Sequence, residues 1–182
     1  DWRINGTSIA VLNMPFEINS SSTVKDYSTY ENNGNIVGNV SWNSSGKVGG
    51  AYSFDGNSDK ISIPNNDGSL NLISGFTLAA WINTNEINNN YPIISQWPGG
   101  WNFKLNSLEQ ISGVVTLDDD STFLIASSSD YVSISTWYHF AFTIDNKTKI
   151  AKLFMDGLPV DSQNFSPTLG ISSTSSNVTI GS

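Results

Sequence analysis

Residues 48–63, VGGAYSFDGNSDKISI, carry the pattern that decides the fold class of this chain. A short, mainly apolar run at 51–54 leads into Asp55-Gly56, a pair that is typical of tight turns. Polar and apolar residues then alternate at 60–63, which is the period of a strand with one buried face. The stretch therefore predicts a strand, a turn and a second strand.

The same alternation and turn signals recur along the rest of the chain. Asp156-Gly157 lies between two apolar runs and supplies the positive φ angles of a type I′ hairpin turn. Residues 118–120, all aspartate, form the expected tip of another hairpin. No segment keeps an apolar period of 3.6 residues, so we predict an all-β protein built as a two-sheet sandwich. Further expected strands cover residues 9–17, 37–42, 76–83, 101–105, 114–117, 123–126, 137–145, 149–155 and 158–160.

The composition limits the classes of partner. The 182 residues fit one domain, because all-β sandwiches often reach this size without dividing. The net charge of −8 argues against nucleic acid, which requires a basic surface, and against anionic membrane surfaces. No apolar run approaches the ~20 residues that span a bilayer, so membrane insertion is not expected. Asp1 opens the chain without a signal peptide, so we expect a fragment excised from a longer protein.

The order and spacing of four segments resemble a known domain family. These are residues 48–63, 77–82 and 137–145, the last followed by FMDG at 154–157, together with the loop KDYSTYENNG at 25–34. The set is similar to the laminin-G-like, concanavalin-A-like jelly roll, and the resemblance covers nearly all of 1–182. It implies a two-sheet antiparallel jelly-roll sandwich that is secreted or displayed on the cell surface and serves recognition or adhesion.

The C-terminal end departs from the pattern of that family. Relatives continue with a last strand that pairs near the first, whereas this sequence stops after Ile180-Gly181. We therefore expect an open sheet edge beside residues 9–17, because exposed edges pair with other chains unless they are blunted. The filler would be downstream sequence of the same chain or a strand from a neighbouring subunit, which would make the protein self-associate.

Catalytic patterns are weak in this sequence. Related jelly-roll glucanases carry Glu-x-Asp-x-x-Glu on one strand, and none of the four glutamates here has a carboxylate at that spacing. His139, the single histidine, lies in a segment expected to be buried on both faces, with no nucleophile motif beside it. We therefore predict that the chain is not an enzyme.

The loop at 25–34 is the candidate metal site. Calcium prefers several oxygen ligands from loop carboxylates, amides and carbonyls. The loop offers such oxygens, and the resemblance implies a structural calcium at the rim in many relatives. The alternative is that these residue types only form turns. The candidate ligands are Asp26, Ser28, Asn32 and Asn33.

The tryptophans divide by context. Trp81 and Trp137 match core positions of the family and are expected to pack inside. The segment QWPGGW at 96–101 differs, because two tryptophans bracket a turn and at least Trp97 should lie on a loop. Flat indole faces suit the apolar face of a sugar ring, although the loop could instead fold over the sheet edge. The candidate ligand-binding residues are Trp97, Trp101, Tyr91, Gln96 and Asn102.

Two functions remain open from the sequence. The first is a non-catalytic extracellular recognition or adhesion module that binds a glycan or a surface protein. The second is a structural subunit or spacer of a cell-surface layer or filament, assembled by β-strand addition.

Overall fold

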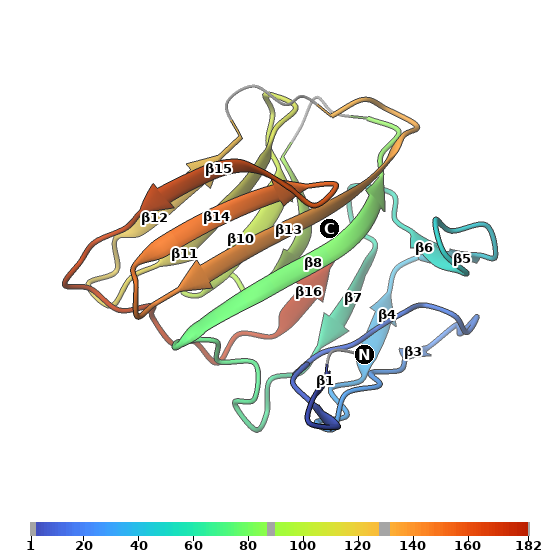
Figure 1. Cartoon of the computed structure of the whole chain (residues 1–182). Coiled ribbons are helices and arrows are strands. Elements are labelled where there is room, and N and C mark those ends of the chain that lie inside the picture. Colours follow the sequence, from blue (N-terminus) through green and yellow to red (C-terminus); the bar gives the residue numbers. More distant parts are fainter. Residues whose placement is uncertain (1–2, 87–89, 128–131, 182) are drawn as a thin grey trace. The chain divides into compact units, whose positions relative to one another are not determined.

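The computed structural model describes residues 3–86, 90–127 and 132–181, and all their regular secondary structure is β-strand (Figure 1). No helix occurs in these ranges, so none there could span a membrane. The chain divides into two compact units, residues 1–71 with 175–182 and residues 72–174. The expectation of one domain over 1–182 stays a prediction.

Residues 72–174 form a sandwich of two antiparallel sheets (Figure 1). One sheet of this unit has the strand order β12-β11-β10-β9, and the other has the order β15-β14-β13-β8. This arrangement confirms the predicted all-β class and the two-sheet antiparallel sandwich. The strands are β8 (Gly75–Asn83), β9 (Tyr91–Ser95), β10 (Trp101–Leu105), β11 (Ile111–Thr116), β12 (Thr122–Ala126), β13 (Trp137–Asp145), β14 (Ile150–Met155) and β15 (Leu158–Asn164).

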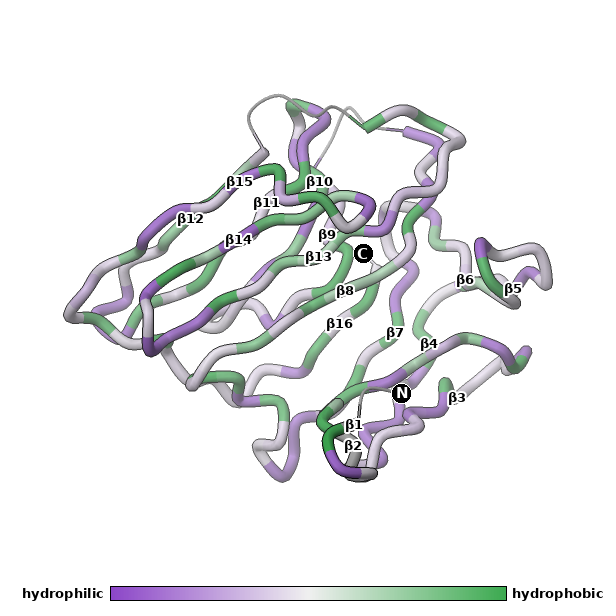
Figure 2. The backbone as a smooth tube through the Cα atoms, in the orientation of Figure 1, coloured by the Kyte–Doolittle hydropathy of each residue, from purple (hydrophilic) through white to green (hydrophobic). Residues whose placement is uncertain are grey.

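Aromatic rings fill the space between these two sheets. Phe103 of β10 stacks on Phe142 of β13 with 5.9 Å between ring centroids, and Phe76 of β8 lies 5.8 Å from Trp101. Gly113 of β11 leaves room for the Phe142 ring, because an added Cβ would lie 2.5 Å from it. Hydrophilic and hydrophobic residues alternate along several of the strands (Figure 2). Because successive side chains of a strand point to opposite faces, this alternation directs every second side chain to the core.

Both predicted hairpins of this unit are present. Asp156 and Gly157 have φ angles of 51° and 82°, as a type I′ turn requires, and they join β14 to β15. β11 pairs with β12 around the acidic tip, with Thr116 opposite Thr122. Short turn signals therefore fixed the local pairing of these strands.

The other unit contains a smaller sheet with the order β16-β7-β4-β3 and two short hairpins, β1–β2 and β5–β6. Its buried apolar side chains include Val24, Ile61, Ile63 and Val178. The strands are β1 (Arg3–Ile4), β2 (Thr7–Ser8), β3 (Thr23–Val24), β4 (Gly34–Val37), β5 (Ser41–Asn43), β6 (Ala51–Ser53), β7 (Lys60–Ile63) and β16 (Val178–Ile180).

The two strands predicted in residues 48–63 exist as β6 and β7, but they do not pair with each other. β6 pairs with β5, whereas β7 pairs with β4 and β16. Asp55 shapes the connection, because its Oδ1 accepts hydrogen bonds of 2.9 Å from each of the backbone N–H groups of Asn57, Ser58 and Asp59.

Two other strand predictions were wrong. Residues 9–17 form no strand, and Phe16 there has a φ of 61°, outside the extended region. Side chains hold this segment instead: Trp42 Nε1 donates to Phe16 O at 2.8 Å. The expected open edge beside 9–17 therefore has no strand to form it, and self-association loses that support. Residues 37–42 are divided between β4 and β5, since Gly38 turns the chain with a φ of 89°.

Candidate functional site

The connection between β9 and β10, residues 96–100, presents Trp97 at the surface; we call it the Trp97 turn. Trp97 is 47% exposed and is followed by a cis peptide bond to Pro98. Gln96 N donates to Trp101 O at 2.8 Å, which closes the base of the turn. Thr174 Oγ1 donates to Pro98 O at 3.1 Å, which fixes its tip. The indole is therefore held partly in solvent by an anchored segment.

Two of the five predicted ligand residues lie inside the protein. Gln96 is 1% exposed and Trp101 is 2% exposed. Trp101 packs on Phe76 in the core, because its position on β10 faces the opposite sheet. Neither side chain offers a surface to a ligand, so we do not retain them as contacts.

Tyr91 is separated from the Trp97 turn. The β9–β10 register pairs Tyr91 with Leu105 and Ser95 with Asn102, so Tyr91 lies roughly 13 Å along β9 from the end that carries the turn. The Tyr91 hydroxyl donates to Glu86 Oε2 at 3.1 Å. Desolvation, followed by this hydrogen bond and the charge of Glu86, raises the pKa of Tyr91. Of the other four candidates, only Asn102 is neither enclosed in the core nor distant from Trp97.

Three buried polar atoms on the outer face of β10 and β11 have no hydrogen-bond partner among the described residues: Asn102 Oδ1, Ser112 Oγ and Thr116 Oγ1. The register places Asn102 opposite Val114, which lies between Ser112 and Thr116 on the same face. Thr116 N donates to Gly100 O at 2.7 Å, so this face adjoins the Trp97 turn. Leaving a buried polar atom unpaired costs about 1–3 kcal/mol, and such atoms often mark a functional or hydrated position.

Ser112 and Thr116 were missed from the sequence. The alternation in ISGVVT at 111–116 places both residues on the face opposite Ile111, Gly113 and Val115. That signal could have indicated an outward polar pair. It could not have shown that their hydroxyls lack partners, since this depends on the neighbouring strands.

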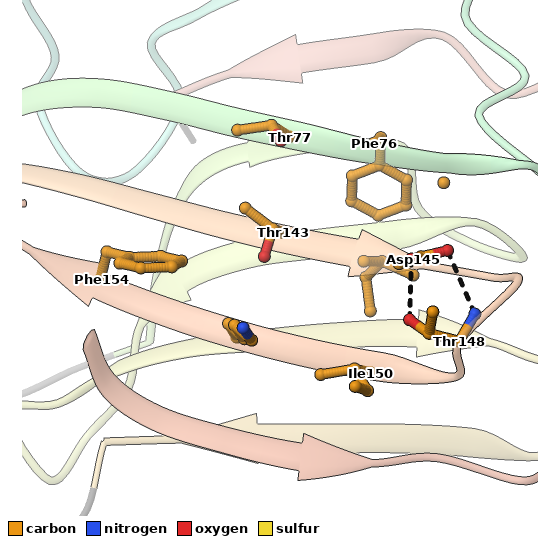
Figure 3. A pocket seen from close by; sticks show the side chains of 10 residues that line it. Phe76, Thr77, Thr143, Asp145, Thr148, Ile150 and Phe154 are labelled. Atoms are coloured by element: carbon orange, nitrogen blue, oxygen red, sulfur yellow. Dashed lines mark hydrogen bonds between the residues drawn. The ribbon is translucent and has the colours of Figure 1, made fainter.

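A hollow of about 540 Å³ lies on the outer face of the other sheet, across β8, β13 and β14 (Figure 3). Asp145 at its edge is turned to its own loop, where Thr148 Oγ1 donates to Oδ2 at 2.7 Å and Lys147 N donates to Oδ1 at 2.8 Å. The hydrogen bond from the Thr148 hydroxyl, with those from the backbone of Lys147 and Thr148, lowers the pKa of Asp145. The lining residues are Gly75, Phe76, Thr77, Thr143, Ile144, Asp145, Thr148, Ile150, Lys152 and Phe154.

The expectation that Trp81 packs in the core was wrong. Trp81 is 42% exposed on the outer face of β8, and its ring contacts His139 of β13 with 5.2 Å between centroids. Side chains alternate between the two faces of β8, and Leu78, an odd number of residues from Trp81, faces inward. His139, expected to be fully buried, is half-buried for the same reason, because it lies opposite Trp81 in the register.

The loop predicted to bind calcium does bring its four residues together around Asp26, which is 1% exposed. Asp26 Oδ1 accepts from Asn13 N at 2.7 Å and from Ser28 N at 2.9 Å. Asp26 Oδ2 accepts from Ser28 Oγ at 2.6 Å and from Asn32 N at 2.8 Å. Asn33 Oδ1 in turn accepts from Asp26 N at 2.9 Å. The carboxylate is thus surrounded by four hydrogen-bond donors.

This donor set does not suit a calcium ion, which needs oxygens that face the cation. Asn32 also turns its amide NH₂ inward, donating to Val11 O at 2.9 Å. Within the described part of the chain, no three His, Cys, Asp or Glu side chains are placed to share a metal. We therefore interpret Asp26, Ser28, Asn32 and Asn33 as a hydrogen-bonded hub that holds residues 11–13, and we derive no role for calcium.

Comparisons with solved structures identify similar folds. The binding domain of Paraclostridial Mosquitocidal Protein 1 is 21% identical with a TM-score of 0.72, over 89% of this chain and 42% of that one. The botulinum neurotoxin serotype G binding domain is 17% identical with a TM-score of 0.74, over 94% and 42%. The serotype D ligand binding domain, solved with N-acetylneuraminic acid, is 17% identical with a TM-score of 0.67, over 86% and 39%. The chain thus spans about two fifths of these structures.

These likenesses support the jelly-roll architecture of the described strands. A comparison with curated proteins finds no match. The family model described as the concanavalin A-like lectin/glucanases superfamily matches residues 55–182, which is more than half of the 182 residues. The chain therefore belongs to the concanavalin A-like lectin/glucanase superfamily.

Proposed function

We propose that this chain is a non-catalytic carbohydrate-binding module, secreted or displayed at the cell surface, which binds glycan at the Trp97 turn. The observation that carries the proposal is a 47% exposed indole on an anchored turn, adjoining the face with the unpaired Asn102 and Thr116 atoms. An aromatic plate next to a few hydrogen-bonding groups is a common arrangement of ligand sites.

The chemistry of the site suits a sugar ring. The indole face of Trp97 would cover the C–H face of a pyranose, which is apolar and flat. Asn102 is half-buried near the start of β10, and because its Oδ1 is buried it would accept a hydrogen bond from an ordered water that bridges to a ring hydroxyl. Ser112 and Thr116 are buried, so they would be reached through an ordered water that bridges to the ligand.

Family and neighbours agree with this reading. The superfamily description includes lectins, and the serotype D ligand binding domain is named as a complex with N-acetylneuraminic acid. Because the chain covers 39% of that structure, carbohydrate binding is proposed for this chain by analogy, and no particular sugar is carried over. A non-catalytic role is proposed because the sequence lacks the Glu-x-Asp-x-x-Glu spacing of related glucanases.

A glycan array with the wild type and two tryptophan variants tests the proposal. We expect the Trp97→Ala variant to lose binding to the neutral glycans on the array that the wild-type protein binds. Trp81→Ala is the matched control, because Trp81 has a similar exposed fraction of 42% on the other sheet. Equal binding by wild type and Trp97→Ala would contradict the proposed site, and wild-type binding to no glycan would contradict the function itself.

A further inference from the structure

The hollow on the outer face of β8, β13 and β14 is separate from the Trp97 turn. It lies on the sheet β15-β14-β13-β8, whereas the Trp97 turn joins two strands of the opposite sheet. Both belong to the unit of residues 72–174. A ligand in the hollow would therefore leave the Trp97 turn free.

The strand register explains which side chains meet on this outer face. Thr77, Thr143 and Lys152 are direct cross-strand neighbours on β8, β13 and β14. Side chains of such a row share one face and lie about 5 Å apart, so two hydroxyls are followed by one ammonium group. The row therefore offers several hydrogen-bonding groups within reach of one ligand.

The adjacent row is apolar, and one of its members, Phe154, lines the hollow. Ala79 and Ala141 are neighbours on β8 and β13, and Phe154 follows on β14. The two alanines are small, so the Phe154 ring stands beside a low surface next to the hydroxyls of the first row. Figure 3 shows Phe154 and Thr143 at the same hollow. This combination suits a ligand with one apolar face and several hydroxyls.

Charge decides the class of ligand. Among the described residues, no ion pair or hydrogen bond engages the ammonium group of Lys152, which lies on the exposed side of β14. The nearest acidic lining residue, Asp145, directs its carboxylate to the backbone and hydroxyl of its own turn. The chain as a whole carries 16 acidic and 8 basic residues, so an unpaired cation in a hollow is a local exception. The lining holds one acid and one base, and because the Asp145 carboxylate is occupied by its own turn, an anionic group of a ligand would find its partner at Lys152 Nζ.

We propose that this hollow is a second ligand site and that it takes a sugar acid, a pyranose that bears a carboxylate. The carboxylate binds Lys152 Nζ, the ring hydroxyls bind Thr77 and Thr143, and the C–H face of the ring lies against Phe154. A volume of about 540 Å³ is within the range of small-molecule sites. The assignment is independent of the Trp97 site, and together with the proposed function it would make the module bivalent.

The test is a titration of the ¹⁵N-labelled chain with sodium glucuronate and with glucose, which differ by one carboxylate. We expect glucuronate to shift the amide signals of β13 and β14 around Lys152, with an affinity about tenfold higher than that of glucose. Lys152→Gln should lower glucuronate affinity about tenfold, the loss expected for one charge-assisted hydrogen bond. Lys147→Gln is the matched control, because this exposed lysine lies on the same hairpin outside the lining.

Two further variants make the outcomes decisive. Thr143→Val keeps the shape of the side chain and should weaken glucuronate binding, whereas Trp97→Ala should leave the shifts at β13 and β14 unchanged. The dispersion of the amide signals confirms that each variant is folded. Equal affinity for glucose and glucuronate, an unaltered Lys152→Gln variant, shifts confined to the Trp97 turn, or no shift at all would each overturn the assignment. If no glycan bound at the Trp97 turn while glucuronate still shifted the β13 and β14 signals, the proposed function would be contradicted and the second site would stand.

Discussion

The loop around Asp26 and the hollow beside Lys152 use similar residue types in opposite ways. In the loop, a buried carboxylate, a hydroxyl and two amides satisfy one another, and little polar capacity faces outward. In the hollow, two threonines and one lysine lie on a sheet face, and the ammonium group has no partner among the described residues. Polar residues therefore stabilise the fold in the first region and are left available for a ligand in the second.

The difference follows from where backbone donors are free. A loop leaves N–H groups unpaired, so a carboxylate such as Asp26 captures them and becomes buried. In a strand in the middle of a sheet, the backbone N–H and C=O groups are hydrogen-bonded to the neighbouring strands. Side chains on its outer face therefore have no free backbone group to pair with. Loop polar residues are thus weaker evidence for a ligand site than outward polar residues on central strands.

Among the variants, Trp101→Ala should have the largest effect on stability. It applies the comparison of satisfied and available side chains to aromatic residues. Trp101→Ala should lower the free energy of unfolding by about 3–5 kcal/mol, because it empties a core position that is 2% exposed. Trp81→Ala should cost only about 1 kcal/mol, the value of an exposed aromatic pair with His139. Urea unfolding of both variants measures the difference, and equal losses would show that the two environments are not distinct.

Replacing Asp26 should give the next largest effect. Asp26→Asn keeps the shape but turns an NH₂ group toward donors such as Ser28 Oγ and Asn32 N, which should cost about 3 kcal/mol. Asp67→Asn is the matched control, because Asp67 is exposed and accepts from the backbone of Ser69 only locally. If thermal unfolding shows the same small change in both variants, the hub does not hold the loop.

Acid should weaken the connection formed by Asp55. The backbone N–H groups of Asp59, Ser58 and Asn57 lower the pKa of Asp55 to about 2. Because the folded pKa lies below the unfolded value of about 4, the unfolded chain binds more protons on acidification, and stability falls between pH about 4 and about 2. Asp55→Asn should flatten this part of the pH profile measured by chemical unfolding. A profile identical to the wild type would contradict the assignment.

Chelation should have the smallest effect. Since the oxygens of Asp26 are already taken by four donors, we expect the same melting temperature with and without a calcium chelator. A fall in melting temperature on chelation that disappears in Asp26→Asn would restore calcium at this loop and remove the contrast with the hollow.

Local sequence signals predicted much of the strand inventory. The Asp-Gly turn at 156–157 and the acidic tip at 118–120 defined their hairpins, because tight turns leave the chain few other pairings. The strand expected at residues 101–105 also matches the bounds of β10. The prediction of a strand at residues 9–17 failed for a different reason. An alternating pattern forms a strand only where a neighbouring strand supplies hydrogen-bond partners.

The sequence by itself determined the all-β class, the hairpins and the placement of Trp97 on a turn, because these depend on periodicity and on residues with special backbone angles. Only the tertiary structure decided that Trp101 is core and Trp81 is surface, and that Asp26 is satisfied while Lys152 is not. The physical reason is that burial and hydrogen-bond satisfaction depend on which face of a strand meets another layer. That choice is made by residues far apart in the sequence.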